Sequence, residues 1–148
     1  MARKAIVSLC GVMIAALLMS CGGRGDHSPG GPEDDGSYGP HELQVLDFLP
    51  ADGVEEPMPV LVYFHGGGFT GGKKRWTPLQ ENALNNGIAA VSANYRLVKP
   101  EGLTVADSMA DAARVVQFLR TKADLWNIDP ERIAVSGTSA GGCMAVWL

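Results

Sequence analysis

The residues best suited to chemistry in this chain surround a serine that lies between two glycines. Residues 137–141, Gly-Thr-Ser-Ala-Gly, match the pattern G-x-S-x-G, which places a serine on a sharp turn between a strand and a helix. Gly137 and Gly141 leave room for that turn because they carry no side chain. A helix that starts directly after the serine directs its N-terminal amides at the serine oxygen. We therefore predict that Ser139 is a nucleophile.

A second glycine-rich turn lies upstream, directly after the apolar run of residues 60–64. It consists of His65, Gly66, Gly67, Gly68 and Phe69. Consecutive glycines allow backbone N–H groups to turn toward a ligand, which is what an oxyanion hole requires. The two turns together indicate acyl-transfer chemistry.

These two motifs, in this order, resemble the α/β-hydrolase family, in particular the HGGG-bearing esterases and lipases related to hormone-sensitive lipase. The resemblance covers residues 42–148 and includes Asn-Tyr-Arg-Leu at 94–97 and Ile-Asp-Pro-Glu-Arg-Ile at 128–133. It implies a serine carboxylic-ester hydrolase in which the amides of Gly67, Gly68 and Ala140 hold the oxyanion. His65 and Gly66 would shape the oxyanion loop. The expected substrate is a small-molecule or carbohydrate-linked ester, and neither a metal nor an organic cofactor is implied.

The acid and the histidine of the triad are not found where this family has them. In the family they follow the serine along the chain, and residues 140–148 contain no acidic residue and no histidine. A serine hydroxyl without a base is a poor nucleophile at neutral pH. The sequence therefore predicts the N-terminal half of such an enzyme, ending after the serine turn and very weakly active alone.

Three other functions fit parts of the same sequence. A serine peptidase of the same fold would use the same serine and amides. A non-catalytic envelope lipoprotein could retain the fold as a scaffold. Gly67, Gly72 and Lys73 also match most of a nucleotide-binding P-loop, but Lys74 stands where that motif needs Ser or Thr for Mg²⁺. We therefore reject nucleotide binding, and the net charge of −4 argues against nucleic acid.

The N-terminal residues have the pattern of an export signal. Arg3 and Lys4 precede an apolar run that is too short and too interrupted to span a bilayer comfortably. Residues 18–21, Leu-Met-Ser-Cys, resemble the lipobox of bacterial lipoproteins, which implies lipidation of Cys21 and attachment to the cell envelope, with the outer membrane favoured. We therefore expect a signal peptide over residues 1–20 and a flexible linker over residues 21–41, which are rich in Gly, Pro and acidic residues.

Residues 42–148 are expected to form an α/β domain whose mostly parallel sheet is covered by helices on both faces. We predict strands over residues 43–49, 60–64, 88–94 and from 132, with 133–135 buried, and helices over 76–86 and 107–123. The second helix has an apolar stripe at helical spacing, formed by Met109, Ala112, Ala113, Val116, Leu119 and Ala123.

Several polar residues near these elements are interpreted as structural. We expect Asp107 and Asp111 to cap their helix or to pair with Arg96 rather than to act as the triad acid, because both precede the serine. Tyr95 and Arg96 are expected to be structural as well. Cys143 is interpreted as a small buried core residue rather than a reactive thiol.

Overall fold

The computed structural model describes residues 36–98 and 102–148. The predicted signal peptide over residues 1–20 and Cys21, the predicted site of lipidation, lie outside the described residues. The described helices and strands follow in the order β1 (Leu46–Leu49), β2 (Met58–Phe64), α1 (Pro78–Leu84), β3 (Ala89–Ala93), α2 (Val105–Thr121), α3 (Ala123–Trp126), β4 (Ile128–Gly137) and α4 (Ala140–Trp147).

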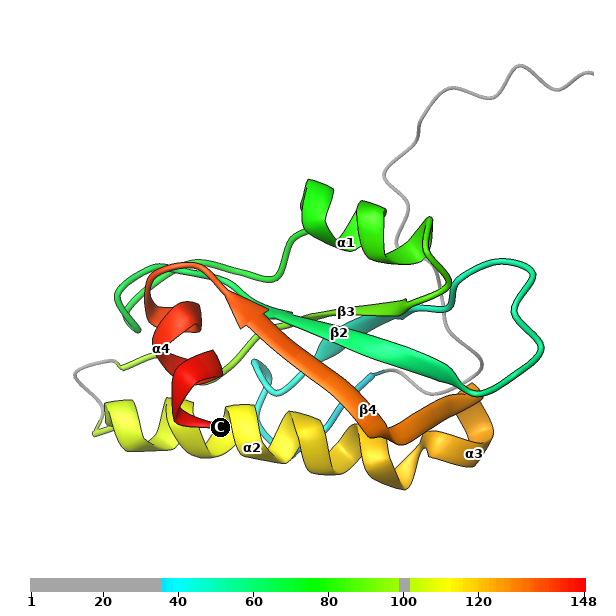
Figure 1. The fold of residues 1–148 in the computed structure, drawn as a ribbon. Helices are drawn as coiled ribbons and strands as arrows, with labels where there is room; N and C mark the ends of the chain where they lie inside the picture. The colour runs from blue at the N-terminus through cyan, green and yellow to red at the C-terminus, as the bar shows by residue number, and fades with distance from the viewer. Residues whose placement is uncertain (1–35, 99–101) are drawn as a thin grey trace, which may run out of the picture.

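The four strands form one sheet in the order β1-β3-β2-β4. β2 runs parallel to β3 and to β4, whereas β1 is antiparallel to β3. Because parallel strands share one carboxyl edge, the turns that follow β2 and β4 meet at the same end of the sheet (Figure 1). The fold is therefore the expected mostly parallel α/β sheet.

Helices lie on both faces of the sheet, with α1 on one face and α2 on the other (Figure 1). The strand order explains this arrangement. The connection through α1 leads from β2 to β3 in one direction, whereas the connection through α2 leads from β3 past β2 to β4 in the other. Right-handed crossovers in opposite directions place their helices on opposite faces.

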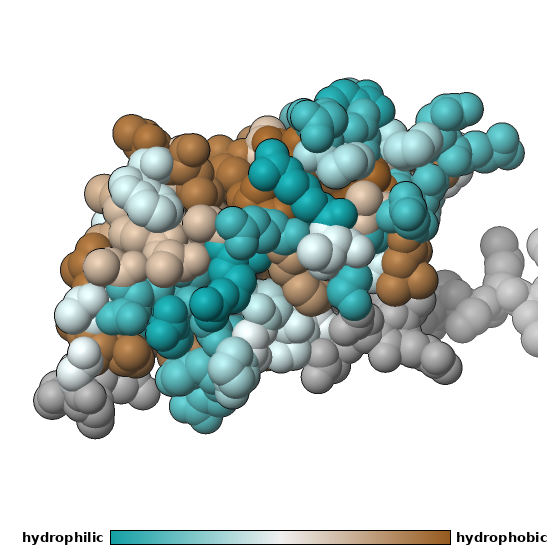
Figure 2. Space-filling model, turned by 90° about the horizontal axis from the view of Figure 1, so that it is seen from below, coloured by the Kyte–Doolittle hydropathy of each residue, from teal (hydrophilic) through white to brown (hydrophobic). Residues whose placement is uncertain are grey.

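The core lies mainly between the sheet and α2. Buried side chains of β2 and β3 pack with those of α2, and Phe48 of β1 stacks on Trp126 of α3 with ring centroids 4.5 Å apart. This core includes Val60, Val62, Phe64, Val91, Val115, Leu119 and Met144. Figure 2 views the molecule from the α2 side and shows hydrophilic surface across its middle beside hydrophobic surface.

Both long helices begin two residues away from the predicted start because their first turns are capped. Thr104 precedes α2, and its backbone N–H donates to Asp107 Oδ2 at 2.8 Å. The equivalent bond at α1 runs from the Thr77 N–H to Gln80 Oε1 at 3.0 Å. Asp107 is thus the third residue of its helix rather than the first, as a capping box requires.

The predicted stripe on α2 splits into two parts. Ala112 and Leu119 are fully buried, but Ala113 and Val116 are only half-buried and line a hollow of about 380 Å³ beside β4. Val115, which the stripe omitted, is fully buried instead. The sheet covers only one side of the helix at this point, so the helical spacing alone placed the buried face incorrectly.

Two further expectations about burial are wrong. Ile133 and Val135 are half-buried and Ala134 is exposed, because β4 is an edge strand and no described strand pairs with its outer side. The flexible linker expected to reach residue 41 also conflicts with Tyr38, which is buried and donates its hydroxyl to Asn94 O at 2.7 Å. Packing therefore begins before residue 42.

Among the described residues, no helix has the length and hydrophobicity needed to cross a membrane.

Candidate active site

Ser139 lies on a strained turn between the end of β4 and the start of α4. Its backbone has φ 53° and ψ −116°, and only Phe69 and Asn127 share a positive φ among the described residues other than glycine. Such a conformation costs about 1–3 kcal/mol and persists only where its surroundings hold it. The Ser139 side chain is exposed, and no described residue forms a hydrogen bond with its Oγ.

The two glycines of the motif are required by close packing of the backbone. A Cβ at Gly137 would lie 2.3 Å from Gly141 C, and a Cβ at Gly141 would lie 2.1 Å from Phe64 O. Both distances are far below van der Waals contact, so neither position can accept a side chain unless the backbone moves. The backbone of the serine turn therefore packs closely against Phe64 at the end of β2.

In the loop of residues 65–68, where we expect the oxyanion hole, two glycines adopt positive φ angles that other residues rarely adopt. Gly67 has φ 132° and Gly68 has φ 59°, and the Gly67 carbonyl accepts the N–H groups of Thr70 and Gly71, both at 3.1 Å. In the described part of the chain, no hydrogen bond uses the amides of Gly67, Gly68 or Ala140. These amides are therefore available to a ligand.

The two turns touch each other. A Cβ at Gly66 would lie 2.9 Å from Thr138 O and 3.3 Å from Ser139 Cβ, and the Thr138 N–H donates to Phe64 O at 3.3 Å. The structure thus brings together the serine and the glycine-rich loop that the sequence singled out separately. A single carbonyl group bound at Ser139 would lie beside this loop.

Comparison with known proteins identifies the family of this chain. The BD-FAE family model matches residues 46–148. The chain belongs to this family of α/β-hydrolase carboxylesterases. Carboxylesterase NlhH of Mycobacterium tuberculosis is 37% identical over 93 residues, which make up 60% of this chain and 28% of that protein. A probable isoprenylcysteine alpha-carbonyl methylesterase of Oryza sativa subsp. japonica is 32% identical over 110 residues, covering 73% of this chain and 26% of that protein.

A solved structure agrees in fold as well as in sequence. A thermophilic esterase of Thermogutta terrifontis with butyrate bound gives a TM-score of 0.63 at 29% identity, covering 74% of this chain and 41% of that one. The predicted fold and the resemblance to α/β-hydrolase esterases are confirmed. This BD-FAE chain spans about a quarter of the length of those two relatives and less than half of the esterase structure.

In this BD-FAE chain His65 holds the glycine-rich loop of residues 65–69 in place. Its ring is buried and stacks on Tyr95 with centroids 4.4 Å apart, and its Nδ1 lies 2.7 Å from Gly66 O. The Tyr95 hydroxyl donates to His65 O at 2.9 Å. Burial lowers the pKa of His65; the Gly66 carbonyl opposes this effect, while the positive charge of Arg75 adds to it. A neutral imidazole that donates its Nδ1–H to Gly66 fits these surroundings.

The aspartates that precede the serine are structural, as predicted. Asp111 is fully buried on α2 and accepts bonds from the Arg96 backbone N–H at 2.9 Å and from its guanidinium at 2.8 Å. Gln44 Nε2 donates to the same carboxylate at 2.7 Å. Asp107 receives the Thr104 N–H and lies 3.5 Å from Arg96. Hydrogen bonds with Thr104 are the main cause of its lowered pKa.

One polar group beside the serine was missed by the sequence analysis. The Tyr63 hydroxyl lies 2.9 Å from Thr138 Oγ1 and accepts a bond from Arg75 Nη2 at 3.3 Å. Burial opposes ionisation of this phenol, but the bonds from Thr138 and Arg75 outweigh burial and lower its pKa. No short motif links these three residues. The parallel pairing of β2 with β4 brings Tyr63 beside Thr138, and hydrogen bonds of the Arg75 backbone with Ser92 of β3 place Arg75 beside Tyr63.

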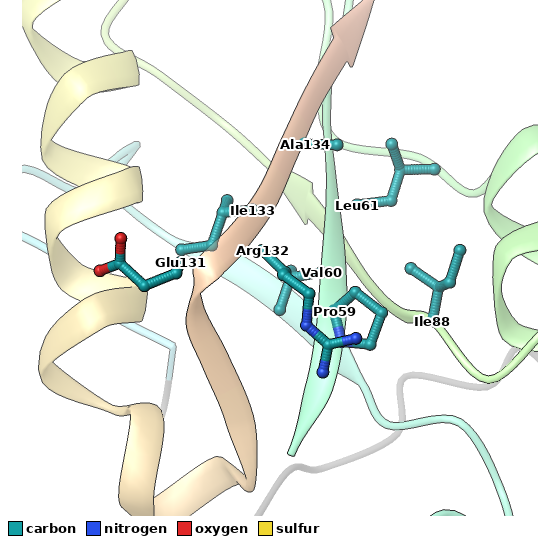
Figure 3. Close-up of a pocket in the computed structure, with 8 residues that line it drawn as sticks. All are labelled: Pro59, Val60, Leu61, Ile88, Glu131, Arg132, Ile133 and Ala134. Atoms are coloured by element: carbon teal, nitrogen blue, oxygen red, sulfur yellow. The ribbon is translucent and has the colours of Figure 1, made fainter. Parts of the chain in front are cut away.

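Two other features do not belong to this site. Cys143 is exposed on α4 rather than buried as predicted, because the outer side of this helix has no described neighbour. An apolar hollow of about 340 Å³ lies beside the first half of β4. In Figure 3, Arg132 and Ala134 face Leu61 and Ile88 across it, whereas Glu131 points away toward α2. The hollow is remote from the carboxyl edge of the sheet, where ligands of open α/β sheets bind.

Proposed function

We propose that this chain supplies the nucleophile and the oxyanion hole of a serine carboxylic-ester hydrolase. The observation that carries the proposal is the contact between the strained Ser139 turn and the Gly66 backbone. In the proposed reaction Ser139 Oγ attacks the ester carbonyl. The amides of Gly67, Gly68 and Ala140 donate to the oxygen on which negative charge develops, and removing one such donor elsewhere costs about 3–4 kcal/mol.

A short-chain ester is the substrate class that we propose. Related structures of the Thermogutta terrifontis esterase hold butyrate or propionate, and the exposed serine turn of this chain is open to a small acyl group. Because no described residue hydrogen-bonds to Ser139 Oγ, we expect this chain alone to react slowly. Covalent labelling is the more sensitive first test, since a stable adduct accumulates over a long incubation in which turnover is too slow to follow.

The test uses paraoxon, which phosphorylates the Thermogutta terrifontis esterase. Ser139 Oγ would lose its proton to the solvent and bond to phosphorus while nitrophenolate leaves, so intact-mass spectrometry should show one diethylphosphoryl adduct on the purified 148-residue chain. Ser139→Ala should abolish the adduct, whereas Ser136→Ala, which alters a serine of the preceding strand, should not. An adduct that persists in Ser139→Ala would refute the assignment. Hydrolysis of nitrophenyl butyrate, followed in parallel, should depend on the same serine.

We further propose that Cys21 anchors the protein to the bacterial cell envelope. The support is the sequence Leu-Met-Ser-Cys at residues 18–21, preceded by an apolar run with two basic residues before it. In cells fed an alkynyl fatty acid, the chain should become labelled and Cys21→Ser should not. Equal labelling of both forms would contradict lipidation at this cysteine.

A further inference from the structure

We infer that a cationic hollow beside the serine turn binds a carboxylate group of the ester substrate, an inference that rests on the proposed ester hydrolysis at Ser139. This cationic hollow has a volume of about 320 Å³ and is lined by His65, Gly66, Gly72, Lys73, Arg75 and Thr138.

The cationic hollow lies beside the serine turn and is lined by the chain neighbour and the packing neighbour of Ser139 rather than by Ser139 itself. Thr138 precedes Ser139 in the chain, and Gly66 packs against Ser139 from the opposite turn. Arg75 and Thr138 also line a neighbouring hollow of about 440 Å³ that extends to Gly137 and Tyr63. The Arg75 side chain therefore lies between two spaces that a substrate bound at Ser139 could enter.

Arg75 is held in position before any ligand arrives. Its backbone N–H donates to Ser92 Oγ at 2.8 Å, and Ser92 Oγ donates back to the Arg75 carbonyl at 2.8 Å. Ser92 is fully buried on β3, and the Arg75 guanidinium donates to Tyr63 at 3.3 Å. The first two bonds hold the backbone of this exposed residue, and the third orients its guanidinium. A side chain oriented in this way loses less conformational freedom on binding an anion than one without a partner.

The positive charge of the hollow is not neutralised by any described carboxylate. Lys74, between the two cations, pairs with Asp47, but neither Lys73 nor Arg75 takes part in a salt bridge within the described part of the chain. His65 adds no compensating negative charge. A guanidinium matches a carboxylate through two parallel hydrogen bonds, so a carboxylate is the ligand group that fits best.

The experiment compares a charged ester with its neutral analogue on the Ser139→Ala chain, which cannot hydrolyse either through that serine. Monomethyl succinate and dimethyl succinate would be titrated separately and followed by NMR chemical shifts. The monoester should bind about fivefold more tightly at low salt, the upper range for an exposed ion pair. This preference should shrink when the salt concentration is raised.

Variants assign the preference to the two cations. Lys73→Gln combined with Arg75→Gln should abolish it. Arg75→Lys should weaken it, because an ammonium group keeps the charge but cannot form two parallel hydrogen bonds. Arg114→Gln, which removes a charge from α2, should leave it unchanged. Equal binding of the two esters by the Ser139→Ala chain, or an equal loss in Arg114→Gln, would overturn the inference. If paraoxon labels Ser139 but the monoester and the diester bind equally, this inference alone is refuted. If the monoester binds more tightly but paraoxon does not label Ser139, the proposed function alone is refuted.

Discussion

Adding one methyl group at Gly141 or at Gly142 should have opposite effects on stability. The two glycines are adjacent in α4, and alanine is favoured over glycine in a helix by about 1 kcal/mol at each position. Their surroundings differ. A Cβ at Gly142 would have Gly137 O as its nearest neighbour, at 3.4 Å, which is an ordinary contact, whereas a Cβ at Gly141 would lie 2.1 Å from Phe64 O and 2.9 Å from His65 O.

The overlap at Gly141 involves only backbone atoms, so no side chain can rotate away. The end of β2 would have to move by more than an ångström relative to α4 to restore contact. Overpacking of this kind costs about 1–3 kcal/mol or more, which exceeds the gain in helix propensity. We therefore expect Gly142→Ala to be up to about 1 kcal/mol more stable than wild type and Gly141→Ala to be about 2 kcal/mol less stable.

Urea denaturation measures this difference, because Trp126 is buried against Phe48 and its fluorescence reports on the core. Gly142→Ala serves as the matched control, since it has the same chemical change in the same helix. If Gly141→Ala were as stable as Gly142→Ala, the close packing of the serine turn on β2 would be wrong. Close packing would then not be the reason for the glycines of the motif.

Two further predictions concern buried groups around the site. Asp111→Ala should lower the free energy of unfolding by about 3 kcal/mol, because it leaves Gln44 and Arg96 without their buried acceptor; a loss below 1 kcal/mol in urea titrations would contradict this. The pKa of His65 lies below its ordinary 6.5 because burial disfavours the imidazolium. The unfolded chain therefore takes up a proton more readily, so the free energy of unfolding should be highest above pH 6.5 and fall below it. His65→Phe should reduce this fall, and an unchanged pH dependence would exclude His65 as its cause.

Local chemistry was enough to predict the two turns of the site and most elements of this fold, although it missed α3 and placed the start of β4 at residue 132 rather than at Ile128. β-rich apolar runs identified β2 and β3, and glycine spacing identified the Ser139 turn, because these features depend on residues close together in sequence. A structural role for Asp107 and Asp111, as helix caps or as partners of Arg96, was also predicted, because both precede the serine along the chain.

Tertiary structure decided which side chains are buried and which are exposed. The edge position of β4 left Ile133 and Val135 half-buried, and the exposure of Cys143 depends on neighbours that helical spacing does not report. Tyr38 joined the core although its segment has the composition of a linker. Each of these outcomes depends on which segments, far apart in the chain, pack beside the residue.

The amino-acid sequence by itself determined that Ser139 stands on a tight turn and that a glycine-rich loop follows an earlier strand. Only the tertiary structure decided that these two turns touch, that the Tyr63 hydroxyl bonds to Thr138 beside them, and that Arg75 donates to Tyr63. The physical reason is the parallel pairing of β2 with β4. Residues far apart in the chain become neighbours when their strands end at the same edge of one sheet.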